Sequence, residues 1–314
     1  MPRPARLTPS HDASQDEPPA DGRGYVLAGQ RLVASALQPG LHVVATPIGA
    51  LADITLRALE TLAGAELVLC EDTRVTRKLV SHYGISTPLS AYHEHNAAEM
   101  RPKVLARLSQ GGRIALVSDA GTPLVSDPGF KLVRDAVEAG AFVTTAPGAS
   151  AVMAALVVSG LPTDRFFFEG FLPPKTHARQ GRVAELSRIP ATLVLFESGP
   201  RLAESLADLA AGLGPRPAAI AREMTKRFEQ VRRGSLAELA AALAGEPAPK
   251  GEIALVIAPP AAEAPTAAED VDALLTAALA RVSVKDAVSE VSSASGVARR
   301  EVYARALELT KARR

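Results

Sequence analysis

The sequence of 314 residues predicts two α/β domains followed by a small helical module, on the basis of three observations. Short apolar runs alternate with helical patterns from Leu41 to Val158, as in a mostly parallel sheet that helices cover on both faces. The alternation resumes after a break near Gly160 and continues to Ala258. A Pro/Ala-rich stretch then precedes amphipathic helices. We therefore divide the chain into a disordered tail (1–38), two α/β domains (39–160 and 161–258), a linker (259–270) and a helical module (271–314).

Composition limits the class of protein. The first residues are rich in Pro, Asp, Ser and Arg and lack the apolar core of a signal peptide. The single cysteine, Cys70, excludes a disulfide framework and a multi-cysteine zinc site. No apolar run approaches the roughly 20 residues that span a bilayer, so we expect a cytoplasmic protein with no membrane contact. A net charge of +1 argues mildly against a surface covered with nucleic-acid contacts.

Each element of the first domain has a local signal. Asp53 stands at a helix N-cap position, and Asn96 with Glu99 matches a capping box. Gly84 and Gly140 each follow a helical pattern and end it. The strands are expected at 41–46, 66–71, 113–119 and 141–146, and the helices after Asp53 and at 73–83, 97–108, 130–139 and 148–158.

The rest of the chain shows the same kind of pattern. Strands are expected at 166–171, 192–198, 218–223, 229–232 and 252–258, with helices at 176–188 and 202–213. In the last module, Ser283 and Asp286 match a capping box, and Ser295-Gly296 forms a turn before a basic helix. This order is that of a helix-turn-helix, and residues 281–314 carry eight Lys/Arg against four Asp/Glu. The alternative is a solvated packing helix.

Three loops that follow strands are rich in Gly, Pro and small residues. They are 46–49, 118–123 and 147–151, with Ser126-Asp127-Pro128-Gly129 behind the second. Ligands of parallel sheets bind at the carboxyl ends of strands, so three such loops predict a binding site rather than simple strand termination. The chain has neither the dinucleotide-binding nor the P-loop glycine motif, which weakens the dehydrogenase and NTPase readings.

Two polar clusters suggest acid–base or substrate-orienting chemistry. Glu71-Asp72-Thr73-Arg74 follows one strand, and His93-Glu94-His95-Asn96 follows another. The two histidines are also a metal hypothesis, but no further ligand has supporting spacing, so we expect no metal. A charged loop, 222–229, contains Met224, which is suited to pack on a planar ring. The alternative for this loop is a solvated surface segment.

These motifs together resemble one family of methyltransferases. The segments that carry the resemblance are VATPIGALADITLRALETL, EDTRVTRKLV, YHEHN, ALVSDAGTPLVSDPG, APGASA, FFFEGFLP, REMTKRFE and KGEIALVI. The chain is identified by them, from about Leu41 to Ala258, as similar to the bacterial ribosomal RNA small subunit methyltransferase I family. That family belongs to the tetrapyrrole-methylase-like class III methyltransferases, and its terminal helix-turn-helix-like module resembles the last helices here.

The resemblance implies two α/β domains that hold S-adenosylmethionine in the cleft between them, in a homodimer. It implies 2′-O-methylation of a cytidine ribose in the decoding centre of 16S rRNA, within the small ribosomal subunit. The wider superfamily has Gly-Gly-Asp-Pro where this chain has Ser-Asp-Ala-Gly-Thr-Pro, so Asp119 need not play the superfamily aspartate's role. The implied cofactor-binding residues are Pro47, Ile48, Gly49, Asp119, Ala120, Gly121, Thr122, Ser150, Ala151, Phe196 and Met224.

Methyl transfer to a ribose hydroxyl needs alignment and a place for the proton. We expect His95 or Asp72 as proton acceptor, Arg74 to orient substrate or phosphate, and Lys226 to stabilise the developing alkoxide. The basic segments 74–78, 175–188 and the last helix are expected to contact RNA phosphates. Two alternatives remain: a methylase of the same fold that acts on a small tetrapyrrole, and a non-catalytic ligand sensor that binds nucleic acid.

Overall fold

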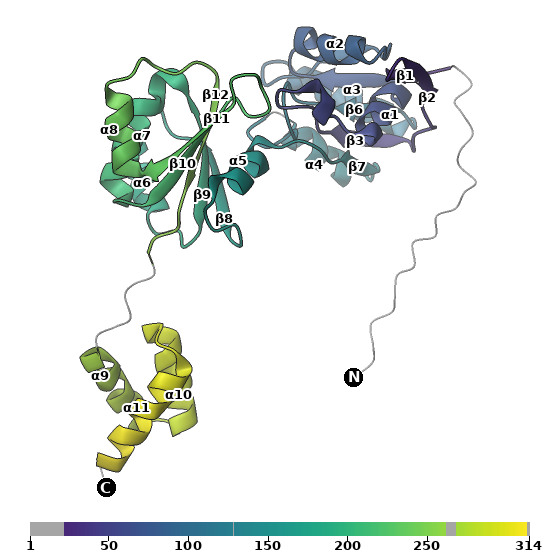
Figure 1. The fold of residues 1–314 in the computed structure, drawn as a ribbon. Helices are drawn as coiled ribbons and strands as arrows, with labels where there is room; N and C mark the ends of the chain where they lie inside the picture. Colours follow the sequence, from purple (N-terminus) through teal and green to yellow (C-terminus); the bar gives the residue numbers. More distant parts are fainter. Residues whose placement is uncertain (1–21, 128, 262–267, 313–314) are drawn as a thin grey trace, which may run out of the picture. The chain divides into compact units, whose positions relative to one another are not determined.

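The computed structural model describes residues 22–127, 129–261 and 268–312. The chain divides into two compact units, residues 1–259 and 260–314, which are described separately here (Figure 1). Both α/β domains belong to the first unit, and the helical module forms the second. No helix in the described ranges is long and apolar enough to cross a membrane.

The first domain is built on a five-stranded sheet in which every pairing is parallel, as predicted. The strand order is β5-β4-β6-β3-β7. Separate apolar clusters cover its two faces, one around Leu59 and Leu62 and the other around Leu116 and Leu132. The elements are β3 (Gly40–Val44), α1 (Leu56–Gly64), β4 (Leu67–Cys70), α2 (Thr73–His82), β5 (Leu89–Ala91), α3 (Ala97–Ser109), β6 (Arg113–Leu116), α4 (Phe130–Glu138) and β7 (Val143–Ala146).

The predicted tail is wrong for its last part. Residues Gly24–Leu27 (β1) and Gln30–Val33 (β2) form an antiparallel hairpin. Tyr25 and Ala34 are buried in the same cluster as α1, and the backbone N–H of Val26 donates to the carbonyl of Tyr83. Because residues 1–38 are mainly polar in composition, these few buried apolar side chains give only a weak signal in the sequence. Residues 1–21 of the predicted tail lie outside the described residues.

Two predicted helix caps also need correction. Asp53 ends a short 3₁₀ turn, Leu51–Asp53, and Thr55 is the N-cap of α1, where its side chain accepts from the N–H of Ala58. Asn96 does occupy the N-cap position of α3, but its side chain makes no cap bond. Its Oδ1 instead accepts from the N–H of His93 at 2.9 Å, which closes the preceding turn.

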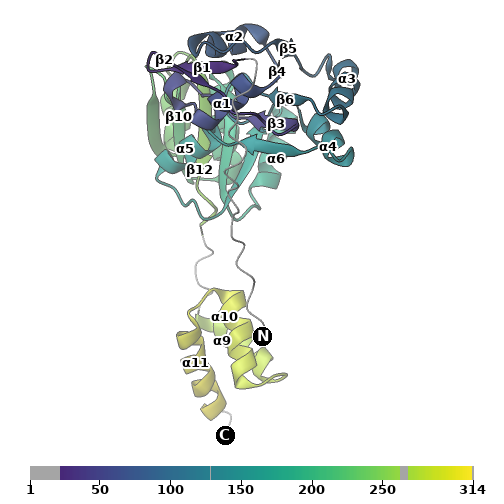
Figure 2. The same ribbon diagram turned by 90° about the vertical axis from the view of Figure 1, so that its right-hand side faces the viewer.

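The second domain has a mixed sheet of order β11-β10-β12-β9-β8, in which only β8 and β9 pair in parallel (Figure 1). Figure 2 shows β10 and β12 of this sheet in a view turned by 90°. Leucines of α6, α7 and α8 pack on one face of this sheet, and α5 packs on the other. Because α5 packs on the second sheet, the predicted domain boundary at 160 lies too late. The elements are α5 (Ala151–Ser159), β8 (Phe166–Phe171), α6 (Thr176–Leu186), β9 (Thr192–Ser198), α7 (Gly199–Leu213), β10 (Pro217–Arg222), β11 (Gln230–Ser235), α8 (Leu236–Ala244) and β12 (Glu252–Ile257).

The second unit contains three helices, α9 (Ala268–Leu279), α10 (Val284–Ser295) and α11 (Arg299–Ala312). They share a small core of their own. The side chain of Ser283 accepts from the N–H of Asp286, as the capping pattern predicts. Since α9 begins at Ala268, the predicted boundary at 270 lies too late, and 262–267 of the linker fall outside the described residues.

Candidate functional site

The three Gly/Pro-rich loops meet at the carboxyl edge of the first sheet and bond to one another. The backbones of Thr46 and Gly121 exchange two hydrogen bonds, of 2.9 and 3.0 Å. The hydroxyl of Thr46 donates to the carbonyl of Ser118, and that of Thr122 donates to the carbonyl of Ala149 at 3.0 Å. Because these loops follow the neighbouring strands β6, β3 and β7, the parallel order brings them together.

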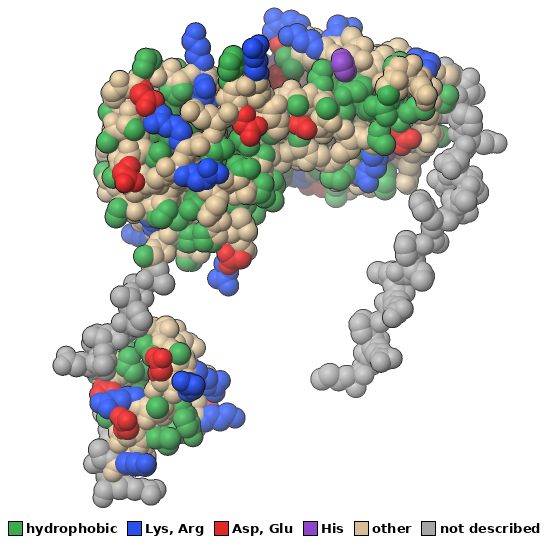
Figure 3. Space-filling model, viewed as in Figure 1, with side chains coloured by type: hydrophobic (Ala, Val, Ile, Leu, Met, Phe, Trp, Pro, Cys, Tyr) green, Lys and Arg blue, Asp and Glu red, His purple; other side chains and the backbone are tan. Residues whose placement is uncertain are grey.

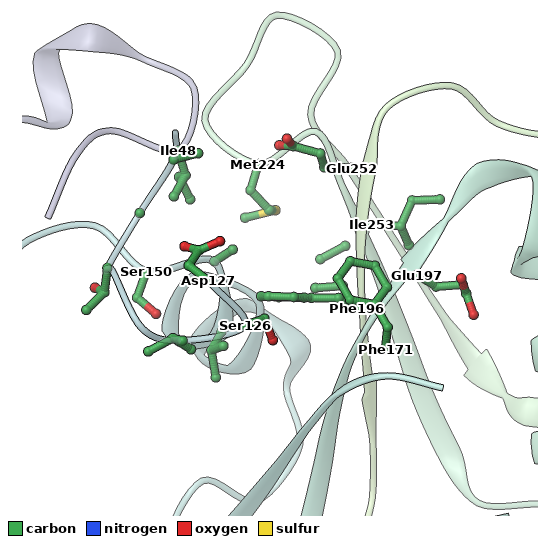
Figure 4. Close-up of a pocket in the computed structure, with 18 of the residues that line it drawn as sticks. Ile48, Ser126, Asp127, Ser150, Phe171, Phe196, Glu197, Met224, Glu252 and Ile253 are labelled. Atoms are coloured by element: carbon green, nitrogen blue, oxygen red, sulfur yellow. The ribbon is translucent and has the colours of Figure 1, made fainter. Parts of the chain in front are cut away.

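A cavity of about 350 Å³ lies against these loops, within the range of small-molecule sites. Its other wall comes from the second sheet, so that both domains of the first unit contribute (Figure 4). Of the eleven predicted cofactor residues, nine line it; Pro47 and Gly49 stand outside the lining on either side of Ile48. The nine are Ile48, Asp119, Ala120, Gly121, Thr122, Ser150, Ala151, Phe196 and Met224.

The wall from the second sheet is mainly apolar and aromatic. The Phe196 ring lies edge-on to the rings of Phe168 and Phe171, with centroids 5.0 and 5.7 Å away. Met224, from the loop between β10 and β11, extends this surface (Figure 4). A slot of this kind suits a flat heteroaromatic ring.

Several lining residues were not predicted. Their signal was weak because most lie at the ends of strands in the second domain, where half of the set are common apolar types and none forms a recognisable motif. Ser126 and Asp127 were noticed in the sequence but were not assigned to the site. The unpredicted residues are Val125, Ser126, Asp127, Val152, Phe171, Glu197, Ser198, Ala221, Gly251, Glu252, Ile253 and Ala254.

The charged groups at the cavity are all acidic. Asp119, Asp127, Glu197 and Glu252 line it, and no lysine, arginine or histidine does so among the described residues. Burial raises the pKa of Asp127 to about 6; hydrogen bonding from Ser118 opposes this rise, and the charges of Glu71 and Asp119 add to it. The cavity therefore favours a ligand that carries positive charge.

The first turn of α5 supplies the opposite polarity at one side of the cavity. Its N-cap, Ser150, makes no side-chain cap bond, and Ala151 and Val152 follow it along the lining. Backbone N–H groups at the start of a helix lack intrahelical acceptors and attract carboxylates. The site thus offers an apolar slot that fits the adenine of S-adenosylmethionine and acidic side chains that fit its sulfonium. The amide donors fit its carboxylate.

The loop between β10 and β11 joins the two domains beside the cavity. The N–H of Ala50 donates to the hydroxyl of Thr225 at 3.0 Å, and the left-handed backbone of Glu223 and Thr225 shapes the loop. Lys226 is held here by Glu223 at 3.0 Å and by Glu252 at 2.8 Å. Its ammonium is thus already paired with two carboxylates and does not line the cavity, which weakens its predicted role as an alkoxide stabiliser.

The other three predicted catalytic residues also stand outside the lining. Asp72 caps α2 by accepting from the N–H of Arg74 and forms an ion pair of 2.6 Å with its guanidinium. Hydrogen bonds from Arg74 lower the pKa of Asp72 to about 2, so this carboxylate is a weak base. His95 is exposed, with its ring 5.9 Å from that of His93. Roles for these residues at the edge of the site remain predictions.

No group of three His, Cys, Asp or Glu side chains suited to a metal ion occurs in the described part of the chain. His93 has a buried ring Nδ1 without a hydrogen-bond partner there. The charge of this histidine acts on Glu71 and opposes the rise that burial produces in the pKa of that carboxyl. Charged groups of both polar clusters, 71–74 and 93–96, therefore act on the same carboxyl.

Two family models match this chain. Residues 40–240 match the family model described as tetrapyrrole (corrin/porphyrin) methylases. Residues 265–310 match the model described as the RsmI C-terminal HTH domain. The two matches correspond to the two compact units of the chain.

Solved structures share the fold at low sequence identity. The uroporphyrin-III-C-methyltransferase of Thermus thermophilus superposes with a TM-score of 0.51 at 22% identity, over 70% of this chain and 94% of that one. A diphthine synthase gives a TM-score of 0.54 at 18% identity, over 69% and 89% of the two chains. Both support the tetrapyrrole methylase fold.

Curated relatives are much closer in sequence. The ribosomal RNA small subunit methyltransferase I of Mesorhizobium japonicum is 51% identical over 285 residues, which are 90% of this chain and 97% of the relative. Its counterpart from Escherichia coli O157:H7 is 43% identical over 286 residues, or 89% and 98%. With both domain models matched and nearly the whole length aligned, this chain belongs to the ribosomal RNA small subunit methyltransferase I family.

Proposed function

We propose that this methyltransferase transfers a methyl group from S-adenosylmethionine to the 2′-hydroxyl of a cytidine ribose in the decoding centre of 16S rRNA. The observation that carries the proposal is the acidic and aromatic cavity at the joined loops of the first sheet, in a chain of this family. The substrate form is the assembled small subunit. Such a substrate would place the protein in the cytoplasm.

The residues of the cavity divide the work of binding. Phe171, Phe196 and Met224 would enclose the adenine ring, and the first-turn amides of α5 would hold the carboxylate. Asp119 and Asp127 would offset the sulfonium charge. When bound, S-adenosylmethionine supplies the electrophilic methyl group. The chain aligns the acceptor hydroxyl and excludes water around it, which is the main source of rate in a displacement of this type.

Fewer basic side chains are available to bind RNA than the sequence suggests. In α6, Arg179 is buried and paired with Asp208 at 2.6 Å, and Arg182 is paired with Glu169. In the helical module, Arg305 is paired with Asp272 at 2.6 Å. The candidates that remain exposed are Arg77, Lys78, Lys175, His177, Arg188, Arg299, Arg300 and Lys311.

The helical module is also less basic as a whole than its last two helices. Residues 268–314 contain eight Lys/Arg and seven Asp/Glu, a net charge of +1, because α9 adds acidic residues. On the face shown in Figure 3, the two signs are interspersed over this module. We therefore expect weak binding to arbitrary RNA and recognition that depends on the shape of an assembled target.

We expect a homodimer as well. Met153 and Val157 lie four residues apart on α5 and are 47% and 67% exposed, so one apolar face of this helix is open to a second copy. A Val157→Glu substitution should shift the mass measured by light scattering from dimer to monomer. A monomeric wild-type protein would refute this expectation.

The test of the proposed function uses S-adenosylmethionine labelled in its methyl group. Assembled small subunits, free 16S rRNA and a uroporphyrinogen are offered as separate acceptors. We expect label in the RNA of assembled subunits, with one linkage resistant to alkaline cleavage, because 2′-O-methylation blocks the attack of that hydroxyl on its phosphate. Label in the tetrapyrrole would favour the small-molecule alternative, and label in neither would favour a ligand sensor.

Deletion of residues 260–314 separates recognition from cofactor binding. The first unit forms its own cores, so the truncated protein should keep its affinity for S-adenosylmethionine. Its affinity for small subunits should fall. Loss of cofactor binding on truncation would instead mean that the helical module has a structural role.

A further inference from the structure

Among the acidic groups of the cavity, Asp127 differs in how the chain presents it. It follows two non-glycine residues with left-handed backbone, Leu124 at φ 72° and Ser126 at φ 65°. This turn carries the Asp127 carboxylate into the cavity, on the side of Ile48 and across from Phe196 (Figure 4). Left-handed backbone at such residues costs free energy, and it is found where a site needs a fixed side-chain direction.

The other three carboxylates of the lining are engaged in structural bonds. Asp119 accepts the backbone N–H of Asp72 at 3.0 Å. Glu197 is 1% exposed and accepts from the N–H of Ser198 and the hydroxyl of Ser205. Glu252 is 72% exposed and paired with Lys226. These bonds occupy oxygens of the three carboxylates and hold them in structural roles.

The surroundings of Asp127 act in the opposite direction. Burial raises its pKa to about 6, and the charges of Glu71 and Asp119 add to the rise, against the hydrogen bond from Ser118. Across the cavity, Glu197 turns its carboxylate away toward Ser205 (Figure 4), and Glu252 is paired with Lys226, which does not line the cavity. The described lining residues therefore include no cation that opposes the rise. A carboxyl with this pKa is ionised at neutral pH yet accepts a proton more readily than an ordinary aspartate.

We propose that Asp127 is the general base of the reaction and accepts the proton of the ribose 2′-hydroxyl, in place of His95 or Asp72. This inference rests on the proposed ribose methylation. In the step, a bond forms between the 2′-oxygen and the methyl carbon while the carbon–sulfur bond breaks. The electron pair of the broken bond stays on sulfur, which becomes a neutral thioether, and the 2′ proton passes to a carboxylate oxygen of Asp127. The proton then leaves to solvent.

Three substitutions test the role in the full-length protein. Asp127→Asn keeps the shape and removes the base, and Asp127→Glu restores a base at a displaced position. Asp53→Asn is the matched control, an exposed aspartate of the same domain outside the cavity. For each protein, single-turnover methyl transfer to small subunits is measured from pH 5 to 8.5 with saturating cofactor, and cofactor affinity is measured by calorimetry.

Wild-type protein and Asp53→Asn should show a rate that falls about tenfold per pH unit below the pKa of Asp127, which is about 6 in the cofactor-free protein and lower beside a bound sulfonium. Asp127→Asn should lose on the order of 10²- to 10⁴-fold in rate and lose this acid limb, while its cofactor affinity changes by less than about tenfold. Asp127→Glu should regain part of the rate together with an acid limb.

An Asp127→Asn protein with a wild-type rate would overturn the proposal. So would a slow variant that keeps the wild-type acid limb, because the aspartate would then act through structure alone. Failure of the wild-type protein to methylate RNA in the same reactions would refute the proposed function and, with it, this role for Asp127. The wild-type reaction therefore distinguishes failure of the proposed function from failure of the proposed role of Asp127.

Discussion

Gly121 offers a sharp test of whether the joined loops form the cofactor site. It lines the cavity, pairs with Thr46 through two backbone hydrogen bonds and has a left-handed backbone, with φ at 82°. A Cβ atom at this position would stand 3.2 Å from the Cγ2 atom of Ile48, which also lines the cavity. Gly111 provides the matched control, because its φ is 81° and a Cβ there meets no atom within 4 Å.

The two alanine substitutions share one cost and differ in another. An L-residue in the left-handed region costs about 1–2 kcal/mol, so both Gly121→Ala and Gly111→Ala should lower the free energy of unfolding by that amount. Gly121→Ala adds the crowding of Ile48, for about 1.4 kcal/mol more, near the low end of the cost of overpacking. If this strain is expressed at the cavity wall, it corresponds to cofactor binding that is about tenfold weaker.

Urea unfolding and calorimetric titration with S-adenosylmethionine measure the two quantities. We expect Gly111→Ala to bind the cofactor within about twofold of wild type despite its loss of stability, and Gly121→Ala to bind about tenfold more weakly. If Gly121→Ala bound like wild type while losing stability like Gly111→Ala, the loop of residues 118–123 would not form the binding surface. Equal losses of affinity in both variants would mean that strain acts globally.

Three further predictions concern stability. Leu206→Ala removes a fully buried side chain of the second core and should lower the free energy of unfolding by about 2–5 kcal/mol, whereas Leu56→Ala, at a position 58% exposed, should change it by about 0.5 kcal/mol or less. Arg179→Met leaves the carboxylate of Asp208 half of a broken buried pair and should cost about 3–5 kcal/mol, and thermal unfolding of the double variant with Asp208→Leu should recover most of this loss. The pKa of Asp127 rises on folding from 3.8 to about 6, so the unfolding free energy of wild type falls as pH rises through this window and stays lower above it. Asp127→Asn should therefore be more stable than wild type by about 1–2 kcal/mol at pH 8 after allowance for solvent screening, and equally stable below pH ~4; an unchanged difference between the two pH values would contradict this.

The three Gly/Pro-rich loops at the cavity were predictable because their sequence signal is local. The strand order of the parallel sheet fixes where they meet. Residues 46–49, 118–123 and 147–151 each follow an apolar run, and parallel strands present their carboxyl ends at one edge. The wall from the second domain was harder to predict. Ala254 is an ordinary strand residue, and only the antiparallel pairing of β12 with β9 brings it beside Phe196.

The predicted catalytic roles of Asp72 and Lys226 are weakened for a different reason. Residue type suggests what a side chain can do, but its partners decide what remains available. The carboxylate of Asp72 is taken by Arg74, two residues away, and the ammonium of Lys226 is taken in part by Glu252, 26 residues away. Asp127 showed the reverse, since its burial and its acidic neighbours appear only after folding.

The all-acidic lining of the cavity also bears on how the protein is freed after each turnover. Asp119 and Asp127 line the space without a basic lining residue among those described, so electrostatic attraction depends on the charge of the occupant. A donor with a sulfonium centre gains this attraction, and the neutral thioether that remains after transfer forgoes it. We therefore expect the acidic lining to favour the incoming donor over the outgoing product without any movement of the backbone.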